Sequence, residues 1–432
     1  MSSEQVASSI DNAEPVQPSE ERIELTSSDM TAKEALLRLI DETECWRTLD
    51  GIVYATVHVD GHQERLAVAS KEFRDWLLNQ LQRRYSSNGR PASATEQAVR
   101  DARAYAEARS YNGDKCPVAL RVMGDENAIY IDRGSSDWSA FQVTPEAWAV
   151  VPIPPVQLVR SRRTGEMPDP SAVADFGPLR NLLRELDEDS FILFLAWCLG
   201  ALSPSGPYPL LLVSGQARSG KSTLVRVANR LVDPCNGDLQ QPPANDRDLI
   251  AAAKHSHLLA FDNLSSVSTD LADSLCRLAT GAEIGGRTLF TNHDSSSFAA
   301  RRPVVLNGIP DLATRGDLLD RSVTIRLHPI QGHRTEGDLR RDLELALQPA
   351  FRGLLDALVA GLARYPSTPT PKMRMADFGR LVIAAEPALP WPSGAFLRAF
   401  EQSRDQVLAA LVDGDVVAKQ IMNYITRHHP KG

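Results

Sequence analysis

The chain has 432 residues, of which 43% are hydrophobic and 24% charged, so it is neither a wholly disordered nor a fibrous protein. This length exceeds what one compact core usually holds and predicts two or three domains. The net charge is -8, but seven acidic residues and a single arginine lie in residues 1–30, which leaves the body nearly neutral. A broad basic surface for nucleic acid is therefore excluded, whereas a local basic channel is not.

The five cysteines lie far apart and form no CxxC pair, which favours neither a disulfide framework nor a zinc site. The N-terminus has no basic and apolar regions of the kind found in signal peptides. The most apolar run, Phe191–Leu202, is too short to cross a bilayer and suits a buried helix. We therefore expect a soluble, cytoplasmic protein without a membrane partner.

The first elements predict an α+β domain over residues 29–150, preceded by a disordered acidic tail over residues 1–28. Ser28-Asp29 is the expected cap of a helix with the sequence TAKEALLRLIDE. YATVHV and HQERLAV read as a hairpin around Asp60-Gly61, because this dipeptide supplies the positive φ angles of a tight turn. Ser70 and Ser93 are expected to start two further helices, and VALRVM and AIYIDRG read as strands.

The rest of the chain predicts an α/β fold. Residues 151–178 are Pro-rich and read as a linker. Its basic cluster, Arg160, Arg162 and Arg163, is expected to be solvated, with contact to phosphate as the minority alternative. Residues 179–330 alternate helices with apolar strands, which is the pattern of a doubly wound parallel sheet. Residues 331–432 are mostly helical and would form a lid or collar.

The strongest motif is a phosphate loop, G-x-x-x-x-G-K-S, set between the strand YPLLLVS and the helix STLVRVANRLV. Its glycines let successive backbone N–H groups point at phosphate oxygens, and the helix N-terminus adds partial positive charge. Lys221 would reach the β- and γ-phosphates of ATP, and the Ser222 hydroxyl would bind Mg²⁺. The residues expected to hold the nucleotide are Gly215, Gln216, Ala217, Arg218, Ser219, Gly220, Lys221, Ser222 and Thr223.

A phosphate loop needs a carboxylate for its metal at the end of a neighbouring strand. Asp262 follows the apolar run LLAF and is the expected Mg²⁺ ligand beside Ser222. Many ring ATPases place Glu next, where it activates the attacking water, but this chain has Asn263. An amide orients a water molecule but cannot accept its proton, so either hydrolysis is slow or Glu283 or another carboxylate serves as the base.

The motifs together resemble the ATPase core of superfamily III helicases, of the AAA+ type. The segments PYPLLLVSGQARSGKST, LLAFDNLSS, LCRLATG, RPVVLNGIPDLATRGDLLDR and MRMADF carry the resemblance. They look most like the primase-associated helicase module of phage and integrative-element replication proteins. The resemblance implies an ATP- and Mg²⁺-dependent AAA+ P-loop NTPase core.

The resemblance also implies further catalytic residues. Asn307, at the end of the strand PVVLN, would lie between the phosphate loop and Asp262 and hold the attacking water or a γ-phosphate oxygen. Arg321 would reach the γ-phosphate of a neighbouring subunit and neutralise transition-state charge. The alternative for Arg321 is an internal salt bridge to Asp317 or Asp320, and Arg315 is a second candidate for the same role.

In superfamily III rings a hairpin with a basic tip grips DNA in the central pore. Here the tip would be Asn292–Asp294, where His293 is a weak phosphate ligand and Asp294 opposes binding, so a plain surface turn is an equal reading. The candidate DNA contacts are Arg287, His293, Arg301 and Arg302. The implied partners are other copies in a hexamer, single-stranded or forked DNA, and a primase or other replication protein.

Two functions remain open. The first is an ATP-driven, ring-forming DNA helicase or translocase for replication of a phage or mobile element. The second is a non-helicase AAA+ ATPase, such as a loader, a remodelling factor or an anti-phage defence ATPase that assembles on ATP. Asn263 and the weakly basic hairpin favour the second function, whereas the resemblance across the whole core favours the first.

Overall fold

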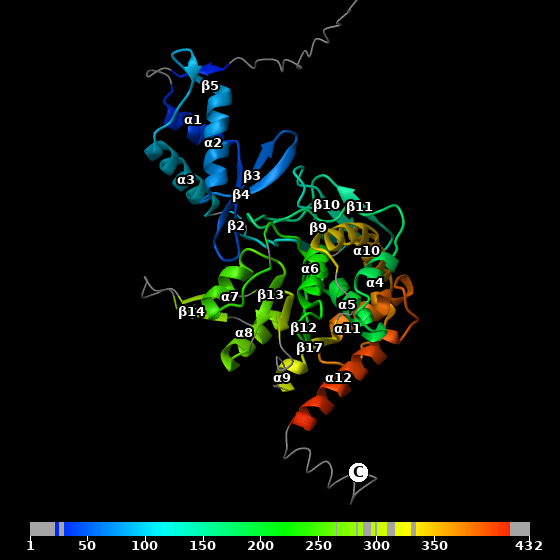
Figure 1. Cartoon of the computed structure of the whole chain (residues 1–432). Coiled ribbons are helices and arrows are strands. Elements are labelled where there is room, and N and C mark those ends of the chain that lie inside the picture. The colour runs from blue at the N-terminus through cyan, green and yellow to red at the C-terminus, as the bar shows by residue number, and fades with distance from the viewer. Residues whose placement is uncertain are drawn as a thin grey trace, which may run out of the picture. The chain divides into compact units, whose positions relative to one another are not determined.

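The computed structural model of the chain shows two compact units (Figure 1). The first comprises residues 1–59 and 64–117, and the second comprises residues 60–63 and 118–432. The described residues are 22–25, 30–111, 113, 115–125, 127–237, 239–264, 266–281, 284–287, 295–298, 300–308, 316–329 and 334–414. Almost all of the predicted acidic tail lies outside them.

The first unit is an α+β fold, as predicted for this part of the chain. One of its sheets has the strand order β4-β3-β2-β7, and a smaller one has the order β1-β5-β6. Apolar side chains from its three helices pack against Ala55 and Val57 of β3 to form the core. The elements are β1 Ile23–Glu24, α1 Ala32–Asp41, β2 Glu44–Thr48, β3 Val53–Val59, β4 His62–Ala67, α2 Lys71–Arg84, β5 Tyr85–Ser87, β6 Arg90–Pro91, α3 Glu96–Ser110 and β7 Lys115–Cys116.

Two predicted helix caps are wrong by a few residues. α1 is capped by Thr31, which forms a capping box with Glu34, rather than by the pair at positions 28 and 29. α3 is capped by Thr95 rather than by Ser93. In both cases the side chain must accept a bond from an N–H group only two or three residues ahead, which the earlier residue cannot reach. The predicted cap of α2 by Ser70 is confirmed.

The second unit begins with an antiparallel sheet of strand order β11-β10-β9-β8. Its strands are β8 Val122–Gly124, β9 Ile129–Asp132, β10 Ala140–Val143 and β11 Trp148–Val151. The sequence placed this region in the N-terminal domain, whereas the boundary in the structure falls after Pro117. The reason is packing, because Ile131 and Phe141 belong to the same buried cluster as the helices of the second unit.

The segment predicted as a linker, residues 151–178, is held against the second unit. Arg160, expected to be solvated, forms a 2.6 Å ion pair with Asp132 and stacks 4.2 Å above the ring of Trp138. Further along, the Gly165 N–H donates to the carbonyl of Pro234 at 2.8 Å. These contacts make the segment part of one folded body, which Pro content alone did not reveal.

A parallel sheet of strand order β13-β16-β12-β17 forms the centre of the second unit, as predicted. Its strands are almost fully buried, which explains their continuous apolar runs. The elements around it are α4 Gly177–Leu182, α5 Glu188–Ala201, β12 Leu210–Gly215, α6 Lys221–Val232, α7 Asp246–Ala253, β13 Leu259–Leu264, α8 Thr269–Thr280, β14 Ile284–Arg287, β15 Ser295–Phe298, β16 Val304–Gly308, α9 Gly316–Leu319 and β17 Ser322–Leu327.

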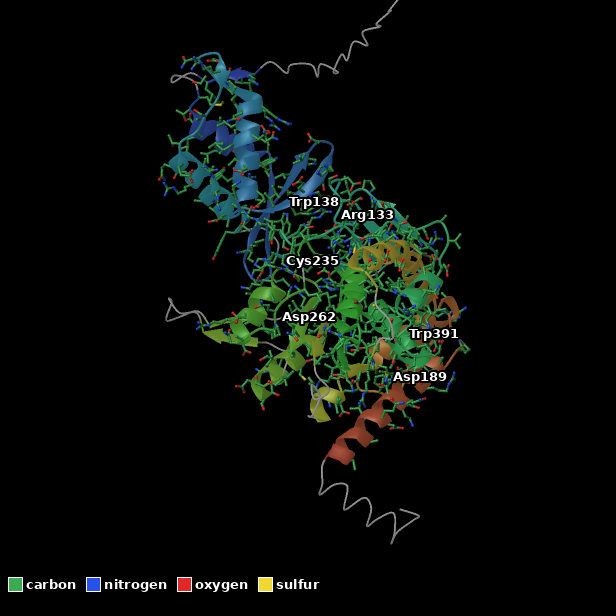
Figure 2. The ribbon with its side chains drawn as sticks, viewed as in Figure 1. Arg133, Trp138, Asp189, Cys235, Asp262 and Trp391 are labelled. Atoms are coloured by element: carbon green, nitrogen blue, oxygen red, sulfur yellow. The ribbon has the colours of Figure 1, made fainter. Side chains whose placement is uncertain are left out.

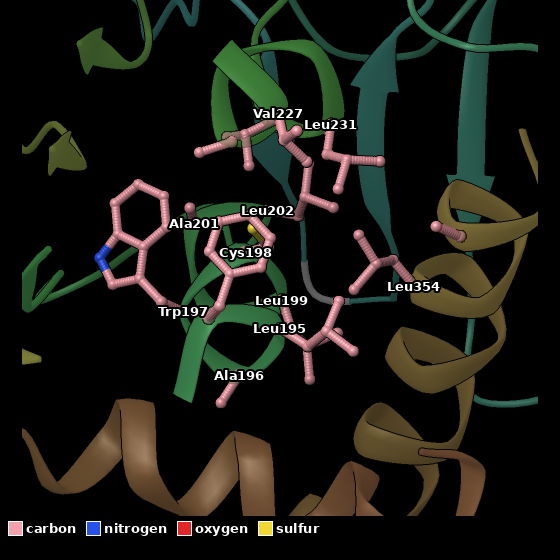
Figure 3. Packing of buried hydrophobic residues seen from close by; sticks show 14 of the residues in the cluster. Leu195, Ala196, Trp197, Cys198, Leu199, Ala201, Leu202, Val227, Leu231 and Leu354 are labelled. Carbon is pink, nitrogen blue, oxygen red and sulfur yellow. The ribbon is translucent and has the colours of Figure 1, made fainter. Parts of the chain in front are cut away.

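α5 belongs to the core along most of its length, since its residues from Ser190 to Ala201 are all buried. Figure 3 shows this helix packed between Val227 and Leu231 of α6 on one side and Leu354 on another. The run Phe191–Leu202 is therefore a buried helix, as predicted. The C-terminal elements are α10 Glu336–Arg364, η1 Tyr365–Ser367, α11 Ala376–Ala385, η2 Glu386–Ala388 and α12 Ala395–Gly414.

Within the described residues, one segment, Glu336–Ser367, is long and apolar enough to cross a membrane. More than half of its most apolar window is buried inside the fold, however. Phe351 and Leu354 of this segment are fully buried, and such burial is typical of a core helix.

Candidate functional site

The loop between β12 and α6 has the shape that its glycines permit. A side chain at Gly215 would place its Cβ only 2.7 Å from both the Leu327 carbonyl oxygen and the Ser219 Oγ. Gly220 has a left-handed backbone, with φ of 80°, and so does Arg218, with φ of 62°. The loop therefore curls tightly against β17, and the two motif glycines sit where a side chain would obstruct or strain it.

The N-terminus of α6 is left open toward this loop. Its N-cap residue is Gly220, which has no side chain to bond the first N–H groups. By contrast, α7 and α8 are capped by Asn245 and Ser268. Uncapped N–H groups and the helix dipole together favour an anion at this position. This geometry fits a phosphate group.

Lys221 lies folded over the loop. Its Nζ donates to the carbonyl oxygens of Gly215 and Gln216, both at 2.7 Å. Partial burial lowers the pKa of Lys221, and the nearby charge of Asp262 opposes that shift. The ammonium group is thus held beside the loop by neutral carbonyls, from which an anion can attract it.

Asp262, Ser222 and Asn307 come together as the sequence predicted. β16 lies between β12 and β13, with Asn307 paired to Val213. The Asp262 Oδ1 accepts a bond from the Ser222 Oγ at 3.0 Å and another from the Asn307 Nδ2. Figure 2 labels Asp262 within this part of the unit. We call these three side chains the carboxyl-end cluster.

The Asn307 amide is oriented by the backbone of Asn263. The Asn263 N–H donates to the Asn307 Oδ1 at 3.2 Å, so the Nδ2 is directed at Asp262. Asn263 itself is exposed and left-handed, with φ of 62°. The residue that replaces the expected glutamate therefore acts here through its main chain.

The donor set fits a nucleotide-bound Mg²⁺. A hydroxyl and a carboxylate are oxygen ligands of the kind that Mg²⁺ prefers, and Mg²⁺ usually takes its remaining ligands from phosphates and water. Among the described residues there is no group of three or more His, Cys, Asp or Glu that could hold a metal ion without such help.

Arg321 lies at the opposite end of the sheet from its own phosphate loop. In the pairing of β12 with β17, Leu210 faces Ser322 and Gly215 faces Leu327. Five residues of parallel strand span about 17 Å, which is beyond the reach of the Arg321 side chain. Its neighbour Asp320 pairs with Arg404 at 3.0 Å. The second candidate, Arg315, and the alternative base, Glu283, lie outside the described residues.

The predicted DNA contacts fall around the hairpin strands β14 and β15, which pair antiparallel. Arg301 donates to the carbonyls of Thr280 and Ser205, at 3.1 and 2.7 Å. Arg302 donates to the Ala253 carbonyl at 3.1 Å, and burial lowers its pKa. His293 lies outside the described residues, and so does the side chain of Arg287. Both described guanidinium groups are therefore engaged within the fold.

A second polar cluster, which the sequence analysis missed, lies at the amino end of β13. Arg121 is fully buried and donates its Nε to the Asp233 Oδ1 at 2.8 Å. Its remaining donors reach the carbonyls of Asp132, Gly165 and Pro234. The Asp233 Oδ2 accepts bonds from the N–H groups of His257 and Leu258. Figure 2 labels Cys235, two residues beyond Asp233. We call Arg121, Asp233 and His257 the amino-end cluster.

Comparison with models of known protein families gives one match for this chain. The model of the actinomycete integrative conjugative element replication protein family matches residues 180–409, which is more than half of the chain. The chain therefore belongs to this family. No curated protein matches it.

Two solved structures are similar at low identity. The A form apo structure of the NrS-1 C terminal region is 12% identical, with a TM-score of 0.41 over 85% of this chain and 74% of that one. A JCV helicase bound to a thiazolopyridine acetamide compound is 15% identical, with a TM-score of 0.24 over 46% of this chain and 60% of that one. Both scores are too low to carry an argument.

Proposed function

We propose that this replication protein is an ATP-dependent, ring-forming DNA helicase or translocase with a superfamily III, AAA+ type core. The observation that carries the proposal is the carboxyl-end cluster. A phosphate loop, a metal-type carboxylate and an amide occupy three adjacent parallel strands, with the strand of Asn307 in the middle. The replication family to which the chain belongs supports a role on DNA.

The residues of the site divide the work. The α6 N-terminus and Lys221 would bind the phosphates of ATP, whose hydrolysis supplies the free energy. Ser222 and Asp262 would hold Mg²⁺. Asn307, oriented by the Asn263 N–H group, would position the attacking water beside Asp262. Asn263 cannot take the proton of that water, so the base is another carboxylate or hydrolysis is slow.

Arg321 supports assembly into a ring, a hexamer by the resemblance. Because it lies more than about 17 Å along the strand from its own loop, a role at a γ-phosphate requires a neighbouring copy. A guanidinium placed there in trans neutralises charge in the transition state. A DNA strand would pass through the central pore of the ring, where the hairpin that carries Arg287 and His293 would contact it.

Mixing two inactive variants tests this assignment. Arg321→Ala should bind ATP without hydrolysing it, and Lys221→Ala should no longer bind the β- and γ-phosphates productively. Mixed together, they should regain part of the turnover, because each supplies the group that the other lacks. If both variants assemble and no ratio restores turnover, Arg321 does not act in trans.

Asn263 supports the non-helicase alternative as well, and DNA binding is the property that distinguishes the two functions. Contacts with a few phosphates predict weak binding with a salt slope of about -0.7 per neutralised phosphate on single strands. If single-stranded DNA neither binds at low salt with ATP nor changes the ATPase rate, the loader or remodelling function replaces the helicase.

A further inference from the structure

A groove of about 270 Å³ lies between the outer strand of the parallel sheet and α12. Its walls come from α9, β17 and α12, which lie together at one end of the second unit (Figure 1). We call it the β17 groove. It is lined by Leu319, Asp320, Ser322, Thr324, Arg374, Phe400, Ser403, Arg404, Val407 and Leu408.

The β17 groove has an apolar floor and a polar rim. Phe400, Val407 and Leu408 supply the apolar side chains from one face of α12. Leu408 is 45% exposed, so part of this apolar surface faces solvent. The rim carries the Asp320–Arg404 ion pair and the exposed Arg374, so the net charge of the rim is positive.

The groove is continuous with the residue proposed to act on a neighbouring copy. Leu319 and Asp320 directly precede Arg321 in the chain, and Ser322 directly follows it. If Arg321 reaches the phosphates of another copy, this surface must meet that copy as well. The inference below rests on the proposed function in this respect.

The other half of such a contact must lie near the phosphate-loop helix. α10 packs along α6, where Glu344 pairs at 2.9 Å with Arg230 in the last turn of that helix. The next residue, Leu345, is 66% exposed. In Figure 1, α10 lies at the opposite end of the second unit from α9 and the free end of α12. Two different surfaces at opposite ends produce a head-to-tail contact, which forms a ring when the rotation between copies closes and an open filament when it does not.

We propose that the β17 groove receives Leu345 of a second copy of this chain. The leucine would fill the apolar floor beside Phe400 and Leu408. The partly exposed carboxylate of Glu344 would come to the positive rim at Arg374. Each copy thus offers one groove and one leucine.

Two variants and their mixture test the proposal. Leu408→Asp damages the groove and keeps the leucine, whereas Leu345→Asp keeps the groove and damages the leucine. With Mg²⁺ and a non-hydrolysable ATP analogue, each variant alone should require at least tenfold more protein than the wild type to assemble. An equimolar mixture retains one intact contact per pair, so it should form heterodimers that grow no further. Light scattering after size exclusion measures these masses.

Val173→Asp is the matched control, because Val173 is 73% exposed and lies outside the groove. It should assemble like the wild type. Formation of heterodimers also demonstrates that both variants are folded. The β17 groove does not hold Leu345 if the wild type assembles and either variant assembles equally well. The same conclusion follows if the mixture stays monomeric. Neither result excludes a ring formed through another contact. If the wild type never assembles with nucleotide, the proposed ring itself fails.

Discussion

Strand β13 has a polar cluster at each end, and the two clusters are built differently. At its amino end, Asp233 bonds Arg121 and two main-chain N–H groups, and all of these groups are buried. At its carboxyl end, Asp262 bonds Ser222 and Asn307 but remains partly exposed. Nearby, the buried Ser219 Oγ has no hydrogen-bond partner, and the helix N-terminus has no cap.

The two clusters differ in how many of their polar groups already have partners within the fold. In the amino-end cluster the Arg121 nitrogens and the Asp233 carboxylate oxygens all have partners within the fold, so removing one partner should destabilise the protein. In the carboxyl-end cluster part of the capacity is unused, which is what binding a charged ligand requires.

Asp233→Ala should produce the largest loss of stability. It leaves the buried Arg121 guanidinium without its charge partner, and removing one member of a buried ion pair typically costs about 3–5 kcal/mol. Urea unfolding measures the effect. The control is Glu336→Ala, which removes an exposed partner 4.0 Å from Arg340 and should lose only a small fraction of that stability. Equal losses in the two variants would contradict the distinction between the clusters.

Lys221→Ala should have the opposite profile. Its Nζ hydrogen-bonds two neutral loop carbonyls, so the unfolding midpoint should hardly change. Turnover should fall by about 10²–10³-fold, the usual effect of removing one group that stabilises transition-state charge. Steady-state ATPase assays measure the loss, and Lys372→Ala, at an exposed site, should retain full rate. Unimpaired ATP affinity and turnover would refute the phosphate-loop assignment.

His257→Gln should change how stability depends on pH. Burial lowers the pKa of His257 to about 4 from its ordinary 6.5. Below pH 6.5 the unfolded chain gains a proton that the folded chain refuses, so stability is lost as pH falls toward 4. The full loss is about 3 kcal/mol at 1.36 kcal/mol per pKa unit.

Glutamine can still donate to the Ala201 carbonyl that the His257 Nε2 contacts at 2.8 Å. The variant should therefore lack this acid-dependent loss. Unfolding free energies at pH 4.5 and 7.5 measure the difference, and parallel pH curves for the two proteins would show that His257 does not titrate as described.

Asn263→Gly should have the smallest effect. Glycine relieves the left-handed strain at φ of 62° and should stabilise the fold by at most about 1 kcal/mol. The N–H bond to Asn307 remains, so turnover should stay within about twofold of the wild type. Asn263→Val, whose branched side chain disfavours this φ, should lower both. If the glycine variant loses turnover while its stability is intact, the side-chain amide of Asn263, and not its main chain, supports turnover.

The sequence predicted the carboxyl-end cluster well because local signals define it. The phosphate loop, the strand before Asp262 and the strand before Asn307 each have their own pattern, and parallel pairing brings their ends together. The amino-end cluster was missed, because Arg121 and Asp233 are 112 residues apart. Residues 118–178 were likewise misplaced, since nothing in their composition reveals that Arg160 pairs with Asp132 and that Phe141 packs into the second unit.

The tight approach of Gly215 to β17 has a mechanical consequence. Arg321 directly precedes that strand, and Leu327, its last residue, lies against Gly215 with no side chain between them. Every residue of β17 from Ser322 to Leu327 is paired with β12, so the two ends of the strand are held in a fixed register. We therefore expect a displacement of Arg321 along the strand axis to move Leu327 against Gly215, so that β17 couples the surface around Arg321 to the wall of the loop before α6.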